Sequence, residues 1–263
     1  MRKVKRRCTM EELKEKLERG EKIAGVMTRI VRNPAIALLA KNAGLDYIMM
    51  DCEHSNFNME TIHDILITAN AIGLAGFVRV PEGTKAWISR VLDTGAAGVM
   101  VPMIETREQA ENLVHYAKYQ PVGGRGYTAG CCHTDYKGGK HSDIMEMGNR
   151  KVIAIAQIET RRAVEHAEEI AATEGIDALL IGPNDLSVSL GIPGDFQNPL
   201  EIEAIKTVAA ACKKHKKAFG LHAGGPLLEQ FADDLTLVMN SMDTDILAAG
   251  LKKVNDTCRS LGK

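Results

Sequence analysis

Two acidic side chains follow apolar runs of the sequence in a pattern that is typical of a metal site. Glu159 ends the run at 152–159, and Asp185 lies in the turn GPNDLS that begins at the end of the run at 178–183. Both offer only oxygen ligands, which suit a hard divalent cation such as Mg²⁺ or Mn²⁺. Gln157 lies two positions before Glu159, so both side chains point to the same side of a strand. Pairing of the two acids with arginines is the structural alternative, and the sequence alone does not choose between them.

An arginine and a histidine after two further runs add groups that can bind an anion and move a proton. Arg79 ends the run GFVR, where a guanidinium can hold a substrate carboxylate through two parallel hydrogen bonds. An ion pair with Glu159 or Asp51 explains the same residue equally well. His54 lies three positions after Asp51 and suits a general base, because imidazole titrates near neutral pH. A structural histidine is the alternative. Asp93, which ends the helical pattern WISRVLD, can orient that imidazole, although spacing does not show the pairing.

The turn GPNDLS presents backbone N–H groups at the point where the chain leaves a strand. Together with Asn184 and Asp185 it can bind an anion or a carboxylate. On its own GPND is only a turn signal. The flanking IGP and LSVSLGIPGD make the pattern more specific. Two other histidines, His133 and His222, are weaker candidates, and we do not expect either to be essential.

Eight short apolar runs must position these groups, and each is nearly continuous in apolar residues. Such runs are typical of strands that are covered on both faces, as in a parallel sheet. The amphipathic stretches between them predict helices, several of which end at glycine. The count of eight favours an α/β fold with a closed (β/α)8 TIM barrel over an open doubly wound sheet, and no GxGxxG follows the first run. The runs cover residues 22–29, 46–51, 76–81, 97–104, 152–159, 178–183, 218–223 and 236–241.

In such a barrel all strands end at one rim, where barrel enzymes place their chemistry. We therefore expect one domain over residues 1–263, with an N-terminal extension and helix at 1–20. The segment 120–150 is too long for a simple connection and is rich in Gly, His and Cys. Because long loops of this kind are commonly functional, we expect it on the active-site side of the barrel.

The composition excludes several kinds of partner. Of 263 residues, 45% are hydrophobic and 25% are charged, and the net charge is −1. This balance argues against nucleic-acid or membrane binding through a strong positive field. The basic cluster between Arg2 and Arg7 precedes no apolar segment, so it is typical of a solvated tail and not of a secretory signal, and no apolar run is long enough to span a membrane. Six scattered cysteines without CxxC spacing indicate reduced thiols and a cytoplasmic protein.

Taken together, the motifs resemble those of the HpcH/HpaI aldolases. These are class II pyruvate aldolases, similar to 2-dehydro-3-deoxyglucarate and 4-hydroxy-2-oxoheptanedioate aldolases. The resemblance covers roughly residues 20–260, and IGPNDLS with QIET at this spacing is its most specific part. The motifs that carry it are DCEH, FVRVP, RVLDTGAAGVMVPMIETREQA, GGRGY, IAQIET and LLIGPNDLSVSLG.

The resemblance implies a (β/α)8 barrel that forms a homo-oligomer, often a hexamer. It also implies that the C-terminal helix, at about 245–262, is exchanged between protomers. Glu159 and Asp185 are the implied ligands of a divalent cation, Mg²⁺ or Mn²⁺ with Co²⁺ as an alternative. The other implied roles are substrate binding by Arg79, Gln157, Asn184 and Asp185, and proton transfer by His54 with Asp93 behind it and Asp51 nearby.

The implied reaction is reversible cleavage of a 4-hydroxy-2-oxo acid to pyruvate and an aldehyde through a metal-stabilised pyruvate enolate. A Schiff-base mechanism would need a lysine at a strand end, and none of the eight ends carries one. A citrate-lyase-β-like CoA-ester lyase is one alternative, although no clear CoA pocket is marked. A non-catalytic barrel that binds a 2-oxo acid is another. The chain departs from its relatives at 126–136, after Arg125, which leaves the contacts to the second substrate open.

Overall fold

A computed structural model describes residues 10–261 of the chain. Eight parallel strands form a closed barrel in the order of the sequence, with each strand paired to the next and β8 paired to β1. This confirms the predicted TIM barrel and all eight predicted strands. The strands are β1 (Ile23–Thr28), β2 (Tyr47–Asp51), β3 (Ala75–Arg79), β4 (Gly98–Val101), β5 (Ile153–Ile158), β6 (Ala178–Ile181), β7 (Ala218–His222) and β8 (Leu237–Met242).

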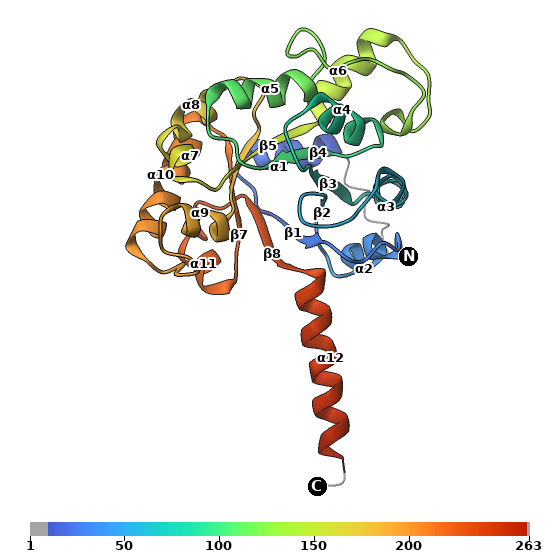
Figure 1. The fold of residues 1–263 in the computed structure, drawn as a ribbon. Helices are drawn as coiled ribbons and strands as arrows, with labels where there is room; N and C mark the ends of the chain where they lie inside the picture. Colours follow the sequence, from blue (N-terminus) through green and yellow to red (C-terminus); the bar gives the residue numbers. More distant parts are fainter. Residues whose placement is uncertain (1–9, 262–263) are drawn as a thin grey trace.

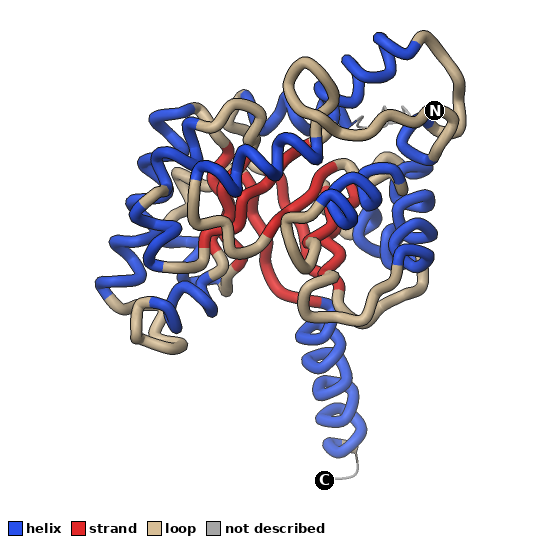
Figure 2. The backbone as a smooth tube through the Cα atoms, turned by 45° about the horizontal axis from the view of Figure 1, so that its top comes forward, coloured by secondary structure: helices blue, strands red, loops and turns tan. Residues whose placement is uncertain are grey.

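Helices surround the barrel, and one of them leaves it (Figures 1 and 2). None of the helices in the described range is long and apolar enough to cross a bilayer. In chain order they are α1 (Met10–Glu18), α2 (Ala35–Asn42), α3 (Met59–Ile72), α4 (Lys85–Asp93), α5 (Arg107–Ala117), the 3-10 turn η1 (Cys132–Thr134), α6 (His141–Lys151), α7 (Arg161–Glu165), α8 (Ala167–Ala172), α9 (Pro183–Ser189), α10 (Pro199–His215), α11 (Gly225–Gln230) and α12 (Asp243–Ser260).

The strands are apolar throughout because they separate two hydrophobic cores. Side chains on the outer face pack against the helices. Alternate side chains, such as Ile23 and Met27 of β1, fill the inside of the barrel. Leu13 and Leu17 of α1 belong to this inner core. The first helix therefore closes the amino end of the barrel, and the basic cluster that precedes it lies outside the described residues.

Local signals set several helix boundaries, as the sequence predicts. Asn58 begins α3 by accepting the Thr61 N–H at 2.9 Å, and Gly73 ends it with a φ of 69°. Only glycine adopts that left-handed conformation at little cost. Thr106 and Gln109 form a reciprocal capping box at the start of α5. These helices lie between strands and fix where each strand end emerges.

The segment 120–150 lies at the opposite end of the barrel from the one we expected. It connects α5 to β5, and such a connection leads to the amino end of the next strand. Its contacts agree: Arg125 Nη2 donates to Asp93 Oδ1 at 2.6 Å, and Asp93 ends the helix that leads into β4. The expectation that this segment borders the strand ends of its own chain is therefore wrong. Length and composition indicated a functional loop, but only the connection order shows which end it occupies.

Candidate active site

Successive side chains along a strand point alternately into the barrel and outward. This alternation determines which polar side chains face the mouth, the open carboxyl end of the barrel. Residues two apart on a strand point to the same side, and Met27, Met49 and Phe77 all lie in the inner core. Counting two positions on from each leads to Arg29, Asp51 and Arg79. The same count on β5 leads from Ile155 to Gln157 and then Glu159, and on β7 it leads to His222. The polar groups predicted from strand ends thus gather at the carboxyl end of the barrel.

Asp51 is fully buried and is held by two arginines. Arg79 donates to it through Nε at 2.9 Å and Nη2 at 2.7 Å, and Arg29 Nε donates to it at 2.8 Å. Backbone N–H groups of Glu53 and His54 also point to its Oδ1. Burial alone would raise the pKa of Asp51, but the hydrogen bonds and charge of Arg79, with Arg29, lower it to about 2. This carboxylate stays ionised and fixes the direction of both guanidinium groups.

Most of the hydrogen-bond donors of Arg79 are directed to other side chains of the protein, so few remain for a ligand. Its Nη1 forms an ion pair with Glu53 at 2.9 Å, and its Nη2 also lies 3.9 Å from the Met27 sulfur. A guanidinium has five N–H groups, and those on Nε and Nη2 are directed to Asp51 and Met27. The ion pair with Asp51 that the sequence left as an alternative is thus present, and the Nη1 group beside Glu53 is the part of Arg79 that can still donate to a ligand.

Glu159 is buried at the mouth and forms no ion pair with any of the residues that the structure describes. Its Oε1 accepts the Met103 N–H at 2.8 Å, and its Oε2 accepts Gln157 Nε2 at 2.6 Å. Met103 has a φ of 54°, a strained value for a residue with a side chain. Burial raises the pKa of Glu159 to about 7, and the carboxylates of Glu53 and Asp185 add to this effect. The charge on Glu159 is therefore held close to other negative charges.

Asp185 completes a pair of oxygen donors. It lies in the first turn of α9, is exposed, and has no hydrogen bond or ion pair within the described range. Acids that are brought together without cations of their own suit a hard divalent ion. Across residues 10–261 no group of three or more His, Cys, Asp and Glu side chains surrounds one point. A cation held by Glu159 and Asp185 would therefore take its remaining ligands from substrate and water.

The two groups assigned to proton transfer are not brought together in this chain. His54 is half exposed, and its Nε2 lies 3.7 Å from the carboxylate of Glu53. Asp93 lies at the amino end of the barrel, where it accepts from Arg125. The predicted pairing of His54 with Asp93 is thus wrong within one chain, because α4 runs away from the mouth. Glu53 is the acid beside His54.

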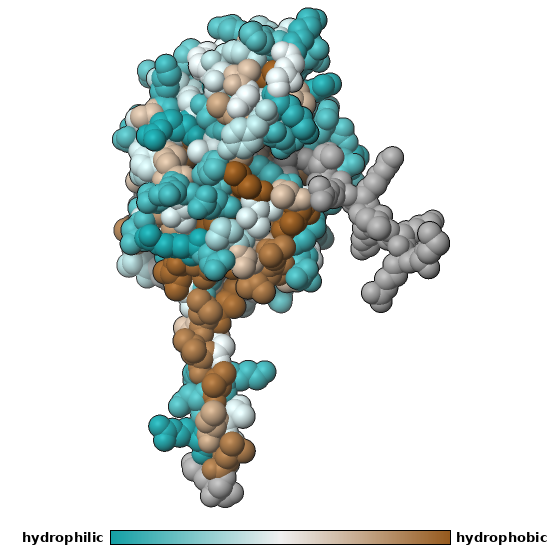
Figure 3. Space-filling view, turned by 90° about the vertical axis from the view of Figure 1, so that its right-hand side faces the viewer, coloured by the Kyte–Doolittle hydropathy of each residue, from teal (hydrophilic) through white to brown (hydrophobic). Residues whose placement is uncertain are grey.

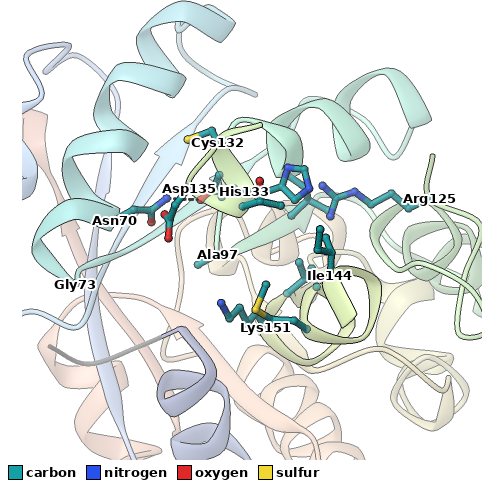
Figure 4. A pocket seen from close by; sticks show the side chains of 16 residues that line it. Asn70, Gly73, Ala97, Arg125, Cys132, His133, Asp135, Ile144 and Lys151 are labelled. Carbon is teal, nitrogen blue, oxygen red and sulfur yellow. Dashed lines mark hydrogen bonds between the residues drawn. The ribbon is translucent and has the colours of Figure 1, made fainter. Parts of the chain in front are cut away.

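His133 also lies at the amino end and belongs to the segment at 120–150. Figure 4 shows it beside Arg125, next to a cavity of about 240 Å³ between this segment and α4. Its Nε2 lies 3.4 Å from the hydroxyl of Tyr119, and the guanidinium of Arg125 stacks on that ring at 4.7 Å. Burial and the charge of Arg125 lower the pKa of His133. This histidine lies away from the cluster at the mouth.

The fold and the site motifs are shared with proteins of known type. A model of the HpcH/HpaI aldolase/citrate lyase family matches residues 30–236. The chain belongs to this family. Its members carry out carbon–carbon bond chemistry, so the chain is an enzyme of the aldolase and lyase type.

Individual members of the HpcH/HpaI family are similar over most of their length. The chain is 35% identical to 5-keto-4-deoxy-D-glucarate aldolase of Klebsiella pneumoniae over 73% of this chain and 74% of that protein. It is 34% identical to 4-hydroxy-4-methyl-2-oxoglutarate aldolase of Hapsidospora irregularis over 80% of this chain and 78% of that protein. The crystal structure of an HpcH/HpaI aldolase from Desulfitobacterium hafniense superposes with a TM-score of 0.90 at 32% identity and covers 95% of this chain and 97% of that one.

Three groups at the mouth of this HpcH/HpaI enzyme were missed by reasoning from strand ends. Arg29, Glu53 and the Met103 N–H all contact predicted site residues. Arg29 was detectable, because it lies two positions after an inward-facing methionine of β1. The Met103 N–H was not, since only the folded loop brings it to Glu159. His222 was ranked low, yet it lines a cavity of about 580 Å³ beside Asn184.

Proposed function

We propose that the enzyme cleaves a 4-hydroxy-2-oxo acid reversibly into pyruvate and an aldehyde, with the help of a divalent cation at Glu159 and Asp185. The observation that carries this proposal is the surplus of negative charge at the mouth. Four acids face two arginines there, and burial next to those acids raises the pKa of Glu159 to about 7. The acids are Asp51, Glu53, Glu159 and Asp185, and the arginines are Arg29 and Arg79.

Binding of the pyruvyl group follows from the donors that remain free at the mouth. Arg79 offers its Nη1 group to the carboxylate, and the first backbone N–H groups of α9, near Asn184, offer further donors. Gln157 donates its amide to Glu159, so its carbonyl oxygen, which is buried and unpaired, can accept a hydrogen bond. When bound, a divalent cation supplies Lewis-acid stabilisation of the negative charge that develops on the 2-oxo oxygen.

Cleavage then needs one proton transfer in each direction. His54 takes the proton of the 4-hydroxyl, the C3–C4 bond breaks, and its electron pair remains on the three-carbon fragment as an enolate. The aldehyde leaves, and protonation at C3 gives pyruvate. Glu53 is the acid beside this base, since its Oε2 lies 3.7 Å from His54 Nε2. Lys118, the buried lysine of the described residues, lies at the amino end with Asp177, so it supports no Schiff base at the mouth.

We also propose that copies of the enzyme associate through α12. This helix projects from the barrel, and of its residues only Asp243 is buried (Figure 1). Figure 3 shows apolar side chains along α12 and around its base. An apolar stripe of this kind is typical of an interface between subunits. It comprises Ile246, Leu247, Leu251 and Val254 on the helix, and the exposed Ile30, whose N–H donates to Asp243, lies at its base.

Exchange of the pyruvate methyl protons in D2O tests the proposed function. With Mg²⁺ or Mn²⁺ we expect exchange, followed by formation of a hydroxy-oxo acid when an aldehyde is added. EDTA should stop both reactions. A barrel that only binds 2-oxo acids would bind pyruvate without exchange, and full activity in EDTA would contradict the role of the cation.

A further inference from the structure

A cavity at the amino end of the barrel takes no part in the proposed function. It has a volume of about 240 Å³ and lies between the segment 120–150 and the barrel (Figure 4). Leu92 and Ala97 line it from the barrel side, and His133 and Ile144 line it from the segment. The segment includes the stretch 126–136, where the chain departs from the shared motifs, so those motifs do not account for the cavity.

Two residues that line the cavity each have a buried polar atom without a partner. Arg125 Nε and Asn70 Oδ1 have no hydrogen-bond partner among residues 10–261. The other end of each side chain is fixed: Arg125 Nη2 donates to Asp93 at 2.6 Å, and Asn70 Nδ2 donates to the carbonyl of Gly95 at 2.9 Å. Native folds rarely leave buried polar atoms unpaired. A donor and an acceptor are therefore available to a molecule that fills the cavity.

The charges around the cavity favour an anion. Arg125, with a side chain only 1% exposed, and Lys151 both line it. Within the described range Lys151 forms no hydrogen bond or ion pair. Asp135 also lines the cavity, but its carboxylate is 72% exposed and lies 3.5 Å from Lys137 Nζ. Because Asp93 balances only Arg125, the charge of Lys151 remains, and a buried guanidinium binds carboxylates well.

The remaining wall of the cavity is apolar and favours an organic ligand. Leu92, Ile144, Met147 and Val152 line it. An inorganic ion would lose its hydration water against these side chains, whereas a hydrocarbon chain gains from the contact. Figure 4 shows Arg125 and Asn70 on opposite sides of the cavity, so a ligand that reaches both needs a polar group at each end.

We propose that this cavity binds a small organic hydroxy acid of about four carbon atoms. Its carboxylate accepts hydrogen bonds from Arg125 and Lys151, and its hydroxyl donates to Asn70 Oδ1 at the other side. The bound acid contacts both the segment 120–150 and the barrel, so binding stabilises the fold. The site is separate from the mouth and does not depend on the proposed function.

The test uses the intact enzyme with 4-hydroxybutyrate as the probe. Butyrate lacks the hydroxyl and 4-hydroxybutanamide lacks the charge. Methyl NMR of the methionines locates the probe, because Met147 lines the cavity and the Met103 N–H binds Glu159 at the mouth. We expect the Met147 signal to shift, with affinity about 5-fold lower for butyrate and about 30-fold lower for the amide. At about ten times the Kd the melting temperature should rise by about 3 °C.

Three variants assign the binding to the cavity. Arg125→Met should weaken binding of 4-hydroxybutyrate by about 30-fold, because charge-assisted hydrogen bonds are lost. Lys151→Met should weaken it by about 5-fold and leaves no acid unpaired, so it decides the question if Arg125→Met does not fold. Arg150→Met is the matched control. Arg150 is 58% exposed, contacts only Glu11 and Glu146, and its removal changes the net charge equally without altering the affinity.

Several results would overturn the proposal. They are unchanged affinity in Lys151→Met and Arg125→Met, equal affinity for the amide, a shift of Met103 in place of Met147, and binding of inorganic phosphate but of no organic acid. Absence of binding by every probe would show that water fills the cavity. Proton exchange into pyruvate tests the proposed function separately, because Arg125 and Lys151 lie at the other end of the barrel.

Discussion

Each end of the barrel buries an aspartate beside two cations, Asp177 at the amino end and Asp51 at the carboxyl end, but the carboxyl end also buries an acid, Glu159, near other acids. At the amino end, Asp177 contacts Lys14 at 2.7 Å and Lys118 at 3.1 Å, and it accepts the Ala154 N–H at 2.7 Å. Burial would raise the pKa of Asp177, but the charges of the two lysines lower it. At the carboxyl end, Glu159 is buried near other acids, and burial with those charges raises its pKa to about 7.

This difference indicates that the buried charges at the amino end stabilise the fold, whereas those at the carboxyl end of the same strands serve function. Matched buried charges hold α1 and α5 against the strand starts, and breaking such a pair costs several kcal/mol. Unmatched buried acids destabilise the free protein and persist where a ligand compensates them. The Asp177 cluster at the amino end is therefore complete by itself, whereas the mouth is complementary to a cation and an anionic substrate.

The largest expected effect comes from removing a charge at the mouth. Glu159→Gln keeps the size of the side chain and its contact with the Met103 N–H but loses the charge that holds a cation. We expect kcat/KM for aldol cleavage to fall on the order of 10⁴-fold, since Lewis-acid stabilisation contributes several kcal/mol. The melting temperature should stay equal or rise. Glu165→Gln, an exposed acid at the end of α7, is the control and should keep full activity.

The reverse pattern is expected at the amino end. Asp177→Asn leaves Lys118 buried without its counter-ion, so we expect the free energy of unfolding to fall by about 3 kcal/mol. Urea unfolding followed by circular dichroism measures this change. The activity per folded molecule should be unchanged. Asp135→Asn, which breaks an exposed pair with Lys137, should cost less than about 0.5 kcal/mol. Equal costs for the two variants would contradict the matched-charge interpretation.

A third buried acid, Glu201, allows the cost of burying a carboxylate to be measured away from the proposed ligand site. Glu201 in the first turn of α10 is fully buried, and neither carboxylate oxygen has a partner among the described residues. Burial raises its pKa from 4.5 to about 7. Between these values the unfolded chain loses its proton first, so stability falls as pH rises and the cost is complete above pH 7.

Glu201→Gln should remove this pH dependence. We expect the variant to be more stable than the wild type by about 2 kcal/mol at pH 8 and equally stable at pH 4, because the helix N-terminus offsets part of the burial cost. Glu203→Gln, an exposed acid on the same helix, is the control. Melting temperatures measured over pH 4–8 test this prediction. If the melting temperature of the wild type and of Glu201→Gln changed equally with pH, Glu201 would have a compensating partner in the fold.

The sequence was sufficient to predict the barrel and most of the mouth. Continuous apolar runs specify strands that are covered on both faces, and strand ends share one rim, so Glu159, Arg79 and Gln157 could be placed together. Residues that act through loops were beyond this reasoning. The Met103 N–H reaches Glu159 only through a strained turn, and no pattern of residue types signals such a turn.

Two expectations are not met within one chain, and for the same physical reason. The segment 120–150 and Asp93 were expected near the mouth from composition and from the resemblance, but the segment is a helix-to-strand connection and Asp93 ends the helix before another one. In a parallel barrel these connections return to the amino end. The order of helices and strands therefore predicts the end of the barrel at which these residues lie, whereas their residue types do not. Arg29 was missed for the opposite reason: the sequence showed that it follows the first apolar strand, but no chemical role was assigned to it.

The smallest expected effect tests how tightly the mouth is packed. A Cβ on Gly182 would lie 2.6 Å from Glu159 Oε2 and 2.7 Å from Gln157 Nε2, so those side chains must move in Gly182→Ala. The backbone there has a negative φ and accepts alanine without strain. We expect a loss of about 10-fold in kcat/KM, because displaced ligands are costly to catalysis, with little change in melting temperature. Gly126→Ala, where a Cβ meets open space, should change neither quantity. If Gly182→Ala lowered stability and spared activity, the mouth would be packed for stability as the amino end is, and the contrast between the two ends would fail.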